Sequence, residues 1–180
     1  LHLQQQMRFE IVGHAVGSYS LAAVNRTLAL SIEAERPGRV RLIPVEDGAL
    51  ADIDRVPQPA RALADRERSP TAPVVAISNH YPVYLPAGPA DLKLALVFWE
   101  ETVVPRAMVD RLEAGFAGVL APTRFVAKAL VDSGLTLPVR VVGQVHPLQD
   151  FAGLAASRRA PAADGVFTFL HVSSCFPRKG

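Results

Sequence analysis

Short apolar runs that end in polar or glycine-rich sequence constrain the fold of this chain more than any other feature. Most of these runs are apolar throughout, as in strands that are buried on both faces, and segments of helical periodicity lie between them. Strands that alternate with helices predict an α/β fold, a Rossmann-like parallel sheet with helices on both faces. The predicted strands span residues 8–12, 40–45, 74–77, 94–99, 119–121 and 139–142.

Helices are predicted between these strands. Apolar residues recur at helical spacing from Ser18 until Pro37 ends the pattern. Pro105 suits the first position of a second helix. Thr123 suits the N-cap of a third helix, which ends near Gly134.

Composition divides the chain into one large domain and the start of another. Residues 46–71 are rich in Pro, Asp, Arg and Ala, so we expect a surface excursion with a short helix over 59–66. The sequence begins without Met and stops after a strand-like run, so we expect a piece of a longer protein. Its predicted parts are a tail or upstream linker at 1–7, an N-terminal domain at 8–150, a linker at 151–165 and the start of a C-terminal domain at 166–180.

Composition and charge exclude several classes of protein. Hydrophobic residues make up 49% of the chain, which argues against disorder. The net charge of +2 gives no basic stripe, so we expect no nucleic-acid partner. Cys175 is the single cysteine, which excludes an internal disulfide and fits a reducing, cytoplasmic compartment. We expect it to be a buried packing residue.

Ligands of open parallel sheets bind beyond the carboxyl ends of the strands, which selects the loops after the apolar runs. The loop 13–20 is a glycine turn that leads into a helix N-terminus, a place that favours an anion. Its Gly-x-x-x-Gly-Ser spacing matches neither the dinucleotide fingerprint nor a P-loop. A tight strand-to-helix connection is the alternative interpretation of the same glycines.

Titratable residues in these loops are candidates for catalysis. Glu100 or Glu101 could accept hydrogen bonds from sugar hydroxyls or act as an acid or base; a solvated pair or a helix cap is the alternative. His14, His80 and His146 lie in predicted carboxyl-end loops, and His80 is a catalytic candidate. We expect no metal site, because no histidine pair has helical ligand spacing.

Four segments, in this order along the chain, resemble the retaining glycosyltransferases of family 4. The last of them matches the strand, loop and Pro-x-Lys-Gly-like turn that open the C-terminal domain of that family. The four segments in this order are much more specific to the family than any one segment alone. The segments are GHAVGSYSLAAVNRTLAL (13–30), FWEETVVP (98–105), VLAPTRFVAKALVDSGLTLPVRVVGQVHPLQDF (119–151) and FTFLHVSSCFPRKG (167–180).

The resemblance implies the GT-B architecture, in which two Rossmann-like domains face each other across the active-site cleft. This chain would be the N-terminal half with the first strand of the donor-binding domain. Gly17 and Ser18 match the glycine loop beside the donor diphosphate or the acceptor, and Lys179, next to Arg178, matches the lysine that contacts the diphosphate. An ammonium there would neutralise charge on the leaving nucleotide. On the acceptor side the resemblance implies Tyr19, Asn79, Trp99 and one of the two glutamates.

The resemblance also implies substrates and partners. The donor would be a nucleotide sugar, with no cofactor and no metal, and the acceptor a glycan or a lipid-linked glycan. The partner would be the remaining C-terminal domain of the same chain, with peripheral contact at the inner face of a membrane.

Several positions depart from the family pattern. Ser173 and Ser174 replace a common Gly-Arg, and Trp99 stands where some relatives have a histidine. His146 and Pro147 stand where relatives often have Gly-Val-Asp, and the chain stops before the Glu-x7-Glu region.

These departures keep two hypotheses open. The favoured one is the N-terminal domain of a retaining glycosyltransferase, inactive as an isolated fragment. The alternative is a noncatalytic domain of the same fold that binds a glycan or positions another domain. A different nucleotide-dependent Rossmann-type enzyme is disfavoured, because the dinucleotide glycine pattern is missing.

Overall fold

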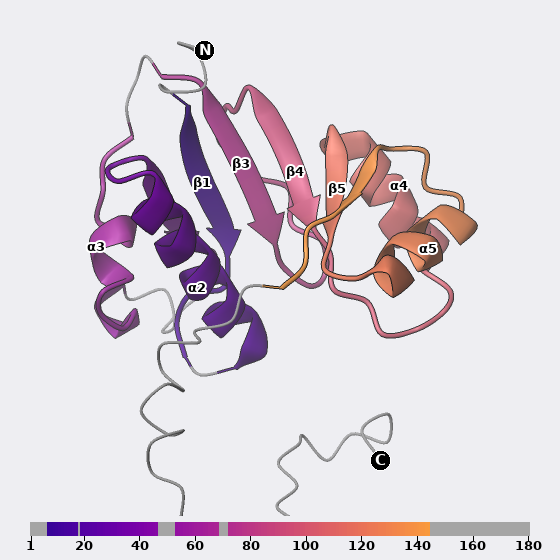
Figure 1. Cartoon of the computed structure of the whole chain (residues 1–180), viewed down its shortest axis with the longest axis horizontal. Helices are drawn as coiled ribbons and strands as arrows, with labels where there is room; N and C mark the ends of the chain where they lie inside the picture. The colour runs from indigo at the N-terminus through magenta and orange to yellow at the C-terminus, as the bar shows by residue number, and fades with distance from the viewer. Residues whose placement is uncertain (1–6, 18, 47–52, 69–71, 145–180) are drawn as a thin grey trace, which may run out of the picture. The chain divides into compact units, whose positions relative to one another are not determined.

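A computed structural model describes residues 7–17, 19–46, 53–68 and 72–144 of the chain. They form a six-stranded, wholly parallel sheet in the order β2-β1-β3-β4-β5-β6, accompanied by helices (Figure 1). The predicted α/β, Rossmann-like fold is confirmed. The strands are β1 Arg8–Gly13, β2 Val40–Pro44, β3 Val74–Asn79, β4 Leu92–Leu96, β5 Gly118–Ala121 and β6 Val139–Val141. The helices are α2 Ser20–Glu35, the 3-10 turn η2 Ile53–Arg55, α3 Arg61–Ala64, α4 Arg106–Gly115 and α5 Arg124–Asp132.

The strand order reverses at β1. From β1 the chain passes outward through α2 to β2, and it then returns to the other side of β1 to form β3. From β3 onward each new strand is added on the same side. The connections that leave the carboxyl ends of β1 and β3 therefore run in opposite directions along the sheet. In doubly wound sheets, a ligand crevice forms at this point.

Two apolar clusters cover opposite faces of the sheet. Successive residues of β4 separate them, because Leu96 belongs to one cluster and Ala95 to the other. The first cluster lies between α2, α3 and the strands β1 to β4. The second joins β4 and β5 to α4 and α5, which lie together on the right of Figure 1.

The second face differs over β1 and β2, where charged side chains replace apolar ones. Glu10 of β1 is only 5% exposed, and its carboxylate pairs with Arg41 of β2 and with Arg68. Tyr84 and the segment 86–88 border this part of the sheet. We call this charged surface of β1 and β2 the open face.

Element boundaries follow the sequence signals closely. Thr123 caps α5 as predicted, because its Oγ1 accepts a hydrogen bond from the N–H of Val126 at 3.2 Å. Pro105 is the N-cap of α4 and not its first helical residue. β4 ends at Leu96, so Trp99 lies in the loop that follows and not in the strand.

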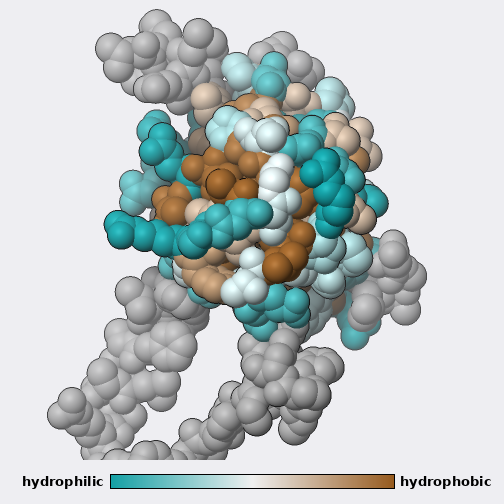
Figure 2. Space-filling view, turned by 90° about the vertical axis from the view of Figure 1, so that its right-hand side faces the viewer, coloured by the Kyte–Doolittle hydropathy of each residue, from teal (hydrophilic) through white to brown (hydrophobic). Residues whose placement is uncertain are grey.

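Among the described residues, β6 is the last strand on the far side of the sheet. Figure 2 shows apolar side chains gathered on this side of the molecule. Exposed apolar residues of α5 and of the segment at β6 include Phe125, Val131, Val141 and Val142. In the part of the chain that the structure describes, β6 is therefore an edge strand with exposed apolar side chains on and beside it.

The sheet belongs to a compact unit that runs from Leu1 to His146. The predicted linker at 151–165 and the predicted second domain at 166–180 lie outside the described residues. In the part of the chain that the structure describes, no helix has both the length and the apolar character needed to cross a membrane.

Glu33, near the end of α2, fastens that helix to β2 and to the segment after α3. Its carboxylate accepts hydrogen bonds from the N–H groups of Gly38 at 2.8 Å and Val40 at 3.1 Å. Arg66 donates two more from its guanidinium, each at 2.8 Å. These partners, Arg66 foremost, lower the pKa of Glu33 from 4.5 to about 2.

Replacing Glu33 with Gln should destabilise the protein near neutral pH by about 1–2 kcal/mol, a figure reduced for solvent screening of a half-buried pair. Because the folded state depresses this pKa, the contribution is complete well above pH 4.5 and is lost as the pH falls toward about 2. Urea unfolding of wild type and E33Q across this pH range measures the gap between their free energies of unfolding. Glu35→Gln at the exposed end of the same helix is the control, and a gap that is independent of pH would contradict the assignment.

Candidate functional site

Asn25 of α2 joins the carboxyl ends of β1 and β3. Its Nδ2 donates to the carbonyl of His14 at 2.9 Å and to that of Asn79 at 3.1 Å, and its Oδ1 accepts from the Asn79 amide at 2.9 Å. The side chain is wholly buried. Gly13 is required beside it, because a Cβ at this position would overlap both the Asn79 carbonyl and the Asn25 amide. The loop after β1 is thus held against the end of β3.

The glycine loop already contains an anion of the chain itself. Oε1 of Glu46, just beyond β2, accepts hydrogen bonds from the N–H groups of Ala15 at 2.5 Å and Val16 at 2.6 Å. The Glu46 side chain is 2% exposed. The sequence predicts an anion in this loop, and the structure shows that two of the loop amides are taken by an internal carboxylate.

Arg26 supports the loop from the helix side. Its Nη1 donates to the carbonyls of Ala15 at 2.6 Å and Gly17 at 2.8 Å. Gly17 has a φ of +84°, a left-handed conformation that disfavours any other residue. Tyr19, at the N-cap of α2, makes no capping hydrogen bond with its side chain. The first turn of α2 is thus left without a side-chain cap at that residue.

Two histidines stack at the junction of β1 and β3. The rings of His14 and His80 are 4.2 Å apart and inclined by 26°. Tyr19 meets His14 edge-on at 5.2 Å, and Tyr84 lies 5.7 Å from His80. His14 also lies 3.9 Å from Oε1 of Glu46, measured from its Nδ1. Residues from the loops after β1, β2 and β3 thus form one cluster, which we call the histidine cluster.

The tautomer of His80 follows from its contact with the backbone. Its Nδ1 lies 2.6 Å from the carbonyl oxygen of Pro82. A carbonyl only accepts, so Nδ1 carries the proton and donates it. In the neutral ring, Nε2 therefore has a lone pair with which to accept a hydrogen bond from a ligand hydroxyl.

The phenol of Tyr19 is also affected by the cluster. Burial, first, and then the negative charge of Glu46 raise the pKa of Tyr19 above its ordinary value, while Arg26 lowers it in part. Burial in turn lowers the pKa of Arg26, against the attraction of Glu46. Tyr19 therefore stays protonated at neutral pH and keeps its hydroxyl donor.

The other predicted residues are divided between two parts of the rim. Asn79 is 2% exposed and bonds to Asn25, so its side chain positions the loop rather than facing a ligand. Trp99 follows β4, donates from Nε1 to the Val103 carbonyl at 3.1 Å, and lies 6.4 Å from the exposed ring of Tyr81.

Glu100 and Glu101 are exposed on the same loop as Trp99, one strand further from β1 than His80. The structure therefore brings His80, Tyr19 and Gly17 together and leaves the two glutamates apart from them in the strand order. Ser18, Arg178 and Lys179, the remaining residues predicted for the diphosphate, lie outside the described residues, as does His146.

Sequence reasoning missed Glu46, Asn25, Arg26 and Tyr84. Glu46 was assigned to the predicted surface excursion, of which it is the first residue. Because it directly follows the predicted strand 40–45, its place after the carboxyl end of a strand could have identified it. Asn25 is a polar residue on the helix face that is otherwise apolar, and this mismatch could have identified it. Tyr84 carries no signal that distinguishes it from other loop tyrosines.

The described residues contain no group of three or more histidine, cysteine or acidic side chains placed to hold a metal ion. Comparison with protein-family models, with curated proteins and with solved structures gave no match to the chain. The chemistry of the site therefore has to be argued from its own residues.

Replacing Glu46 with Gln should lower the pKa of Tyr19, because the negative charge beside the phenol is removed. The pKa should remain above 10.0, since burial is the larger cause of its elevation. Spectrophotometric titration of the tyrosinate, with Tyr19→Phe to identify the signal, measures this pKa. An identical Tyr19 titration in wild type and E46Q would show that the carboxylate does not act on the phenol.

Replacing Asn25 with Ala should lower the free energy of unfolding by about 2–4 kcal/mol. The change removes the hydrogen-bond partner of two buried carbonyls and of the Asn79 amide, and it leaves a small cavity. Denaturant unfolding monitored by circular dichroism measures the loss. Glu35→Ala on the exposed end of α2 is the control and should change stability little. A loss in N25A as small as in the control would be inconsistent with a fastening role.

Proposed function

We propose that this chain is the N-terminal domain of a retaining glycosyltransferase of GT-B type, with a nucleotide sugar as donor and a glycan or lipid-linked glycan as acceptor. The fold supports the proposal, because a parallel α/β sheet of this kind is what the resemblance implies for that domain. The activity would reside in the cytoplasm and would need no metal or cofactor.

The observation that carries the proposal is the histidine cluster at the junction of β1 and β3. A ligand crevice is expected at this junction, and here the cluster supplies an imidazole Nε2 and a protonated phenol, while the buried carboxylate of Glu46 holds the loop that carries the phenol. Hydroxyl-rich ligands are recognised by such mixed donors and acceptors. The exposed ring of Tyr81 next to Trp99 adds an aromatic surface on the same rim.

In the proposed transfer, the acceptor oxygen bonds to the anomeric carbon of the donor sugar while the bond from that carbon to the diphosphate breaks. The acceptor proton passes to the leaving diphosphate, so no protein nucleophile is required. His80 would orient the acceptor hydroxyl through Nε2, and Lys179 would stabilise charge on the diphosphate.

A noncatalytic, glycan-binding domain of the same fold is the second candidate. The observation in its favour is the Glu46 carboxylate, which occupies two amides of the loop that the resemblance assigns to the donor diphosphate or the acceptor. A diphosphate next to this carboxylate would be repelled unless Lys179 or another cation compensates. Such a domain would bind glycan without releasing nucleotide.

The protein that contains this chain should release nucleoside diphosphate from a sugar nucleotide when an acceptor glycan is present and should retain the anomeric configuration. His80→Asn should lower kcat by about 100-fold and change the donor KM by less than about twofold, because Asn can mimic the Nδ1 donor but not Nε2. Steady-state kinetics with and without a chelator make the measurement. Lys128→Gln on exposed α5 is the control.

Two results would decide between the candidates. Glycan binding with no turnover for any sugar nucleotide supports the noncatalytic domain and refutes the enzyme. Transfer that is unchanged in Lys179→Ala, relative to Lys128→Ala, removes Lys179 from the donor site. The isolated 180 residues are expected to be inactive, and turnover by them would contradict the assignment of the donor site to a further domain.

A further inference from the structure

A cavity of about 350 Å³ lies on the open face and reaches the histidine cluster. Side chains that alternate onto this face of β1 and β2 line it, namely Glu10, Val12, Arg41 and Ile43. Tyr84 of the histidine cluster lines it as well. Volumes of about 300–1,000 Å³ are typical of small-molecule sites, so the cavity is large enough for a ligand of that kind. We call it the open-face cavity.

The segment 84–89, most of which walls the cavity, is fastened at three backbone carbonyl groups. The hydrogen bonds run from Ser78 to Tyr84 at 2.8 Å, from Lys93 to Pro86 at 3.1 Å and from Arg68 to Pro89. Ser78 and Lys93 belong to β3 and β4, so the sheet itself holds this wall. Little ordering is therefore needed when a ligand binds, which lowers the free-energy cost of binding.

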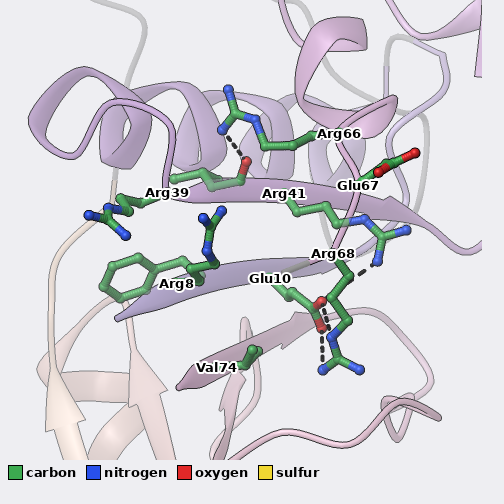
Figure 3. A pocket seen from close by; sticks show the side chains of 10 residues that line it. Arg8, Glu10, Arg39, Arg41, Arg66, Glu67, Arg68 and Val74 are labelled. Carbon is green, nitrogen blue, oxygen red and sulfur yellow. Dashed lines mark hydrogen bonds and ion pairs between the residues drawn. The ribbon is translucent and has the colours of Figure 1, made fainter. Parts of the chain in front are cut away.

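The charged side chains that line the cavity balance one another. Glu10 forms ion pairs with Arg68 at 3.0 Å and with Arg41 at 3.6 Å, and Figure 3 shows Arg68 directed at Glu10. Glu46 completes the charged residues of the lining. Two carboxylates and two guanidinium groups give the lining no net charge, so it favours neither a phosphate nor an ammonium group. A neutral polar ligand matches it better.

Two polar atoms of these side chains are buried without a hydrogen-bond partner among the described residues. One is a donor, Nε of Arg41, and the other is an acceptor, Oε2 of Glu46. The amides of Ala15 and Val16 bind only Oε1 of that carboxylate. The Tyr19 hydroxyl interacts with the same carboxylate, but outside the geometry of a normal hydrogen bond to Oε2. Because a hydroxyl group both donates and accepts, the hydroxyls of one ligand can pair with both atoms.

We propose that the open-face cavity binds a neutral sugar unit, whose hydroxyl groups pair with Oε2 of Glu46 and Nε of Arg41. The apolar side chains of Val12 and Ile43 suit the C–H faces of a sugar ring, and Tyr84 adds an aromatic side chain beside them. Because Tyr84 also belongs to the histidine cluster, the cavity extends the site that the proposed function uses. The inference therefore rests on the proposed function, and it adds that the glycan carries an uncharged sugar at this place.

Nuclear magnetic resonance titration of the isotope-labelled 180-residue chain with the methyl glycosides of glucose, galactose and mannose tests binding. At least one glycoside should shift the amide signals of Val12, Ile43 and Gly88, which line the cavity. The uronic acid and the amino sugar that correspond to the best-bound glycoside should bind about tenfold more weakly or worse. The reason is that each brings a charge that the balanced lining does not compensate.

Ile43→Trp fills the cavity from a half-buried position of β2 without changing any charge, and it should weaken binding by about tenfold or more. Val141→Trp makes the matching change at an exposed position of β6 and should alter binding by less than about twofold. Arg41→Met provides a second test if I43W unfolds. It removes the Nε donor and should weaken binding by about threefold or more. Circular dichroism verifies that each variant is folded.

The proposal is overturned if no neutral glycoside shifts the cavity residues, or if V141W weakens binding as much as I43W does. Equal binding of the charged analogues would overturn the assignment of a neutral sugar. These measurements need no sugar nucleotide, so they fail separately from the proposed transfer. Transfer by the whole protein without binding in the cavity would refute this inference alone, whereas binding without any turnover would support it and refute the transferase.

Discussion

The position of the histidine cluster depends on one buried amide. Asn25 donates to two carbonyls and accepts from a second amide, so it joins α2 to the ends of both β1 and β3. These two strands are the ones from which the chain diverges in opposite directions. Among the described residues, this amide is a group of α2 that bonds to both the His14 and the Asn79 carbonyls. The two stacked rings therefore lie on loops whose backbone is held by buried hydrogen bonds.

Glu46 changes how the glycine loop is interpreted, because two of the amides that the sequence assigns to an external anion bind this carboxylate instead. A helix N-terminus after a glycine turn attracts negative charge, and the chain satisfies part of this tendency internally. The same carboxylate adjoins His14 and adds to the effect of burial, which is the larger cause, in raising the pKa of Tyr19. It thus links the end of β2 to the loop after β1 and places a negative charge beside the cluster. A substrate anion at this loop would have to be accommodated alongside it.

The sequence was sufficient for the fold because strand and helix signals were local. Apolar runs located every strand of the sheet. Thr123 was recognised as the N-cap of α5 because threonine is a preferred residue at that position. The site was only partly predictable. His80 and Tyr19 were found from their place after strands, but the role of Asn79 depended on a partner 54 residues away. Glu46 was missed because its contacts lie 30 and 31 residues back in the chain, in a loop that composition does not mark.

The alternation of side chains along β1 divides that strand between two tasks. Phe9 and Ile11 belong to the apolar core under α2, and Gly13 makes room for the Asn25 amide. The intervening positions, Glu10 among them, lie on the open face, where Glu10 pairs with Arg41 of β2 and with Arg68. A loss or gain of one residue within β1 would exchange the two sets and place charge beneath the helix. The number of residues within β1 is therefore constrained by both faces of the sheet, and the strand can gain or lose residues only at its ends.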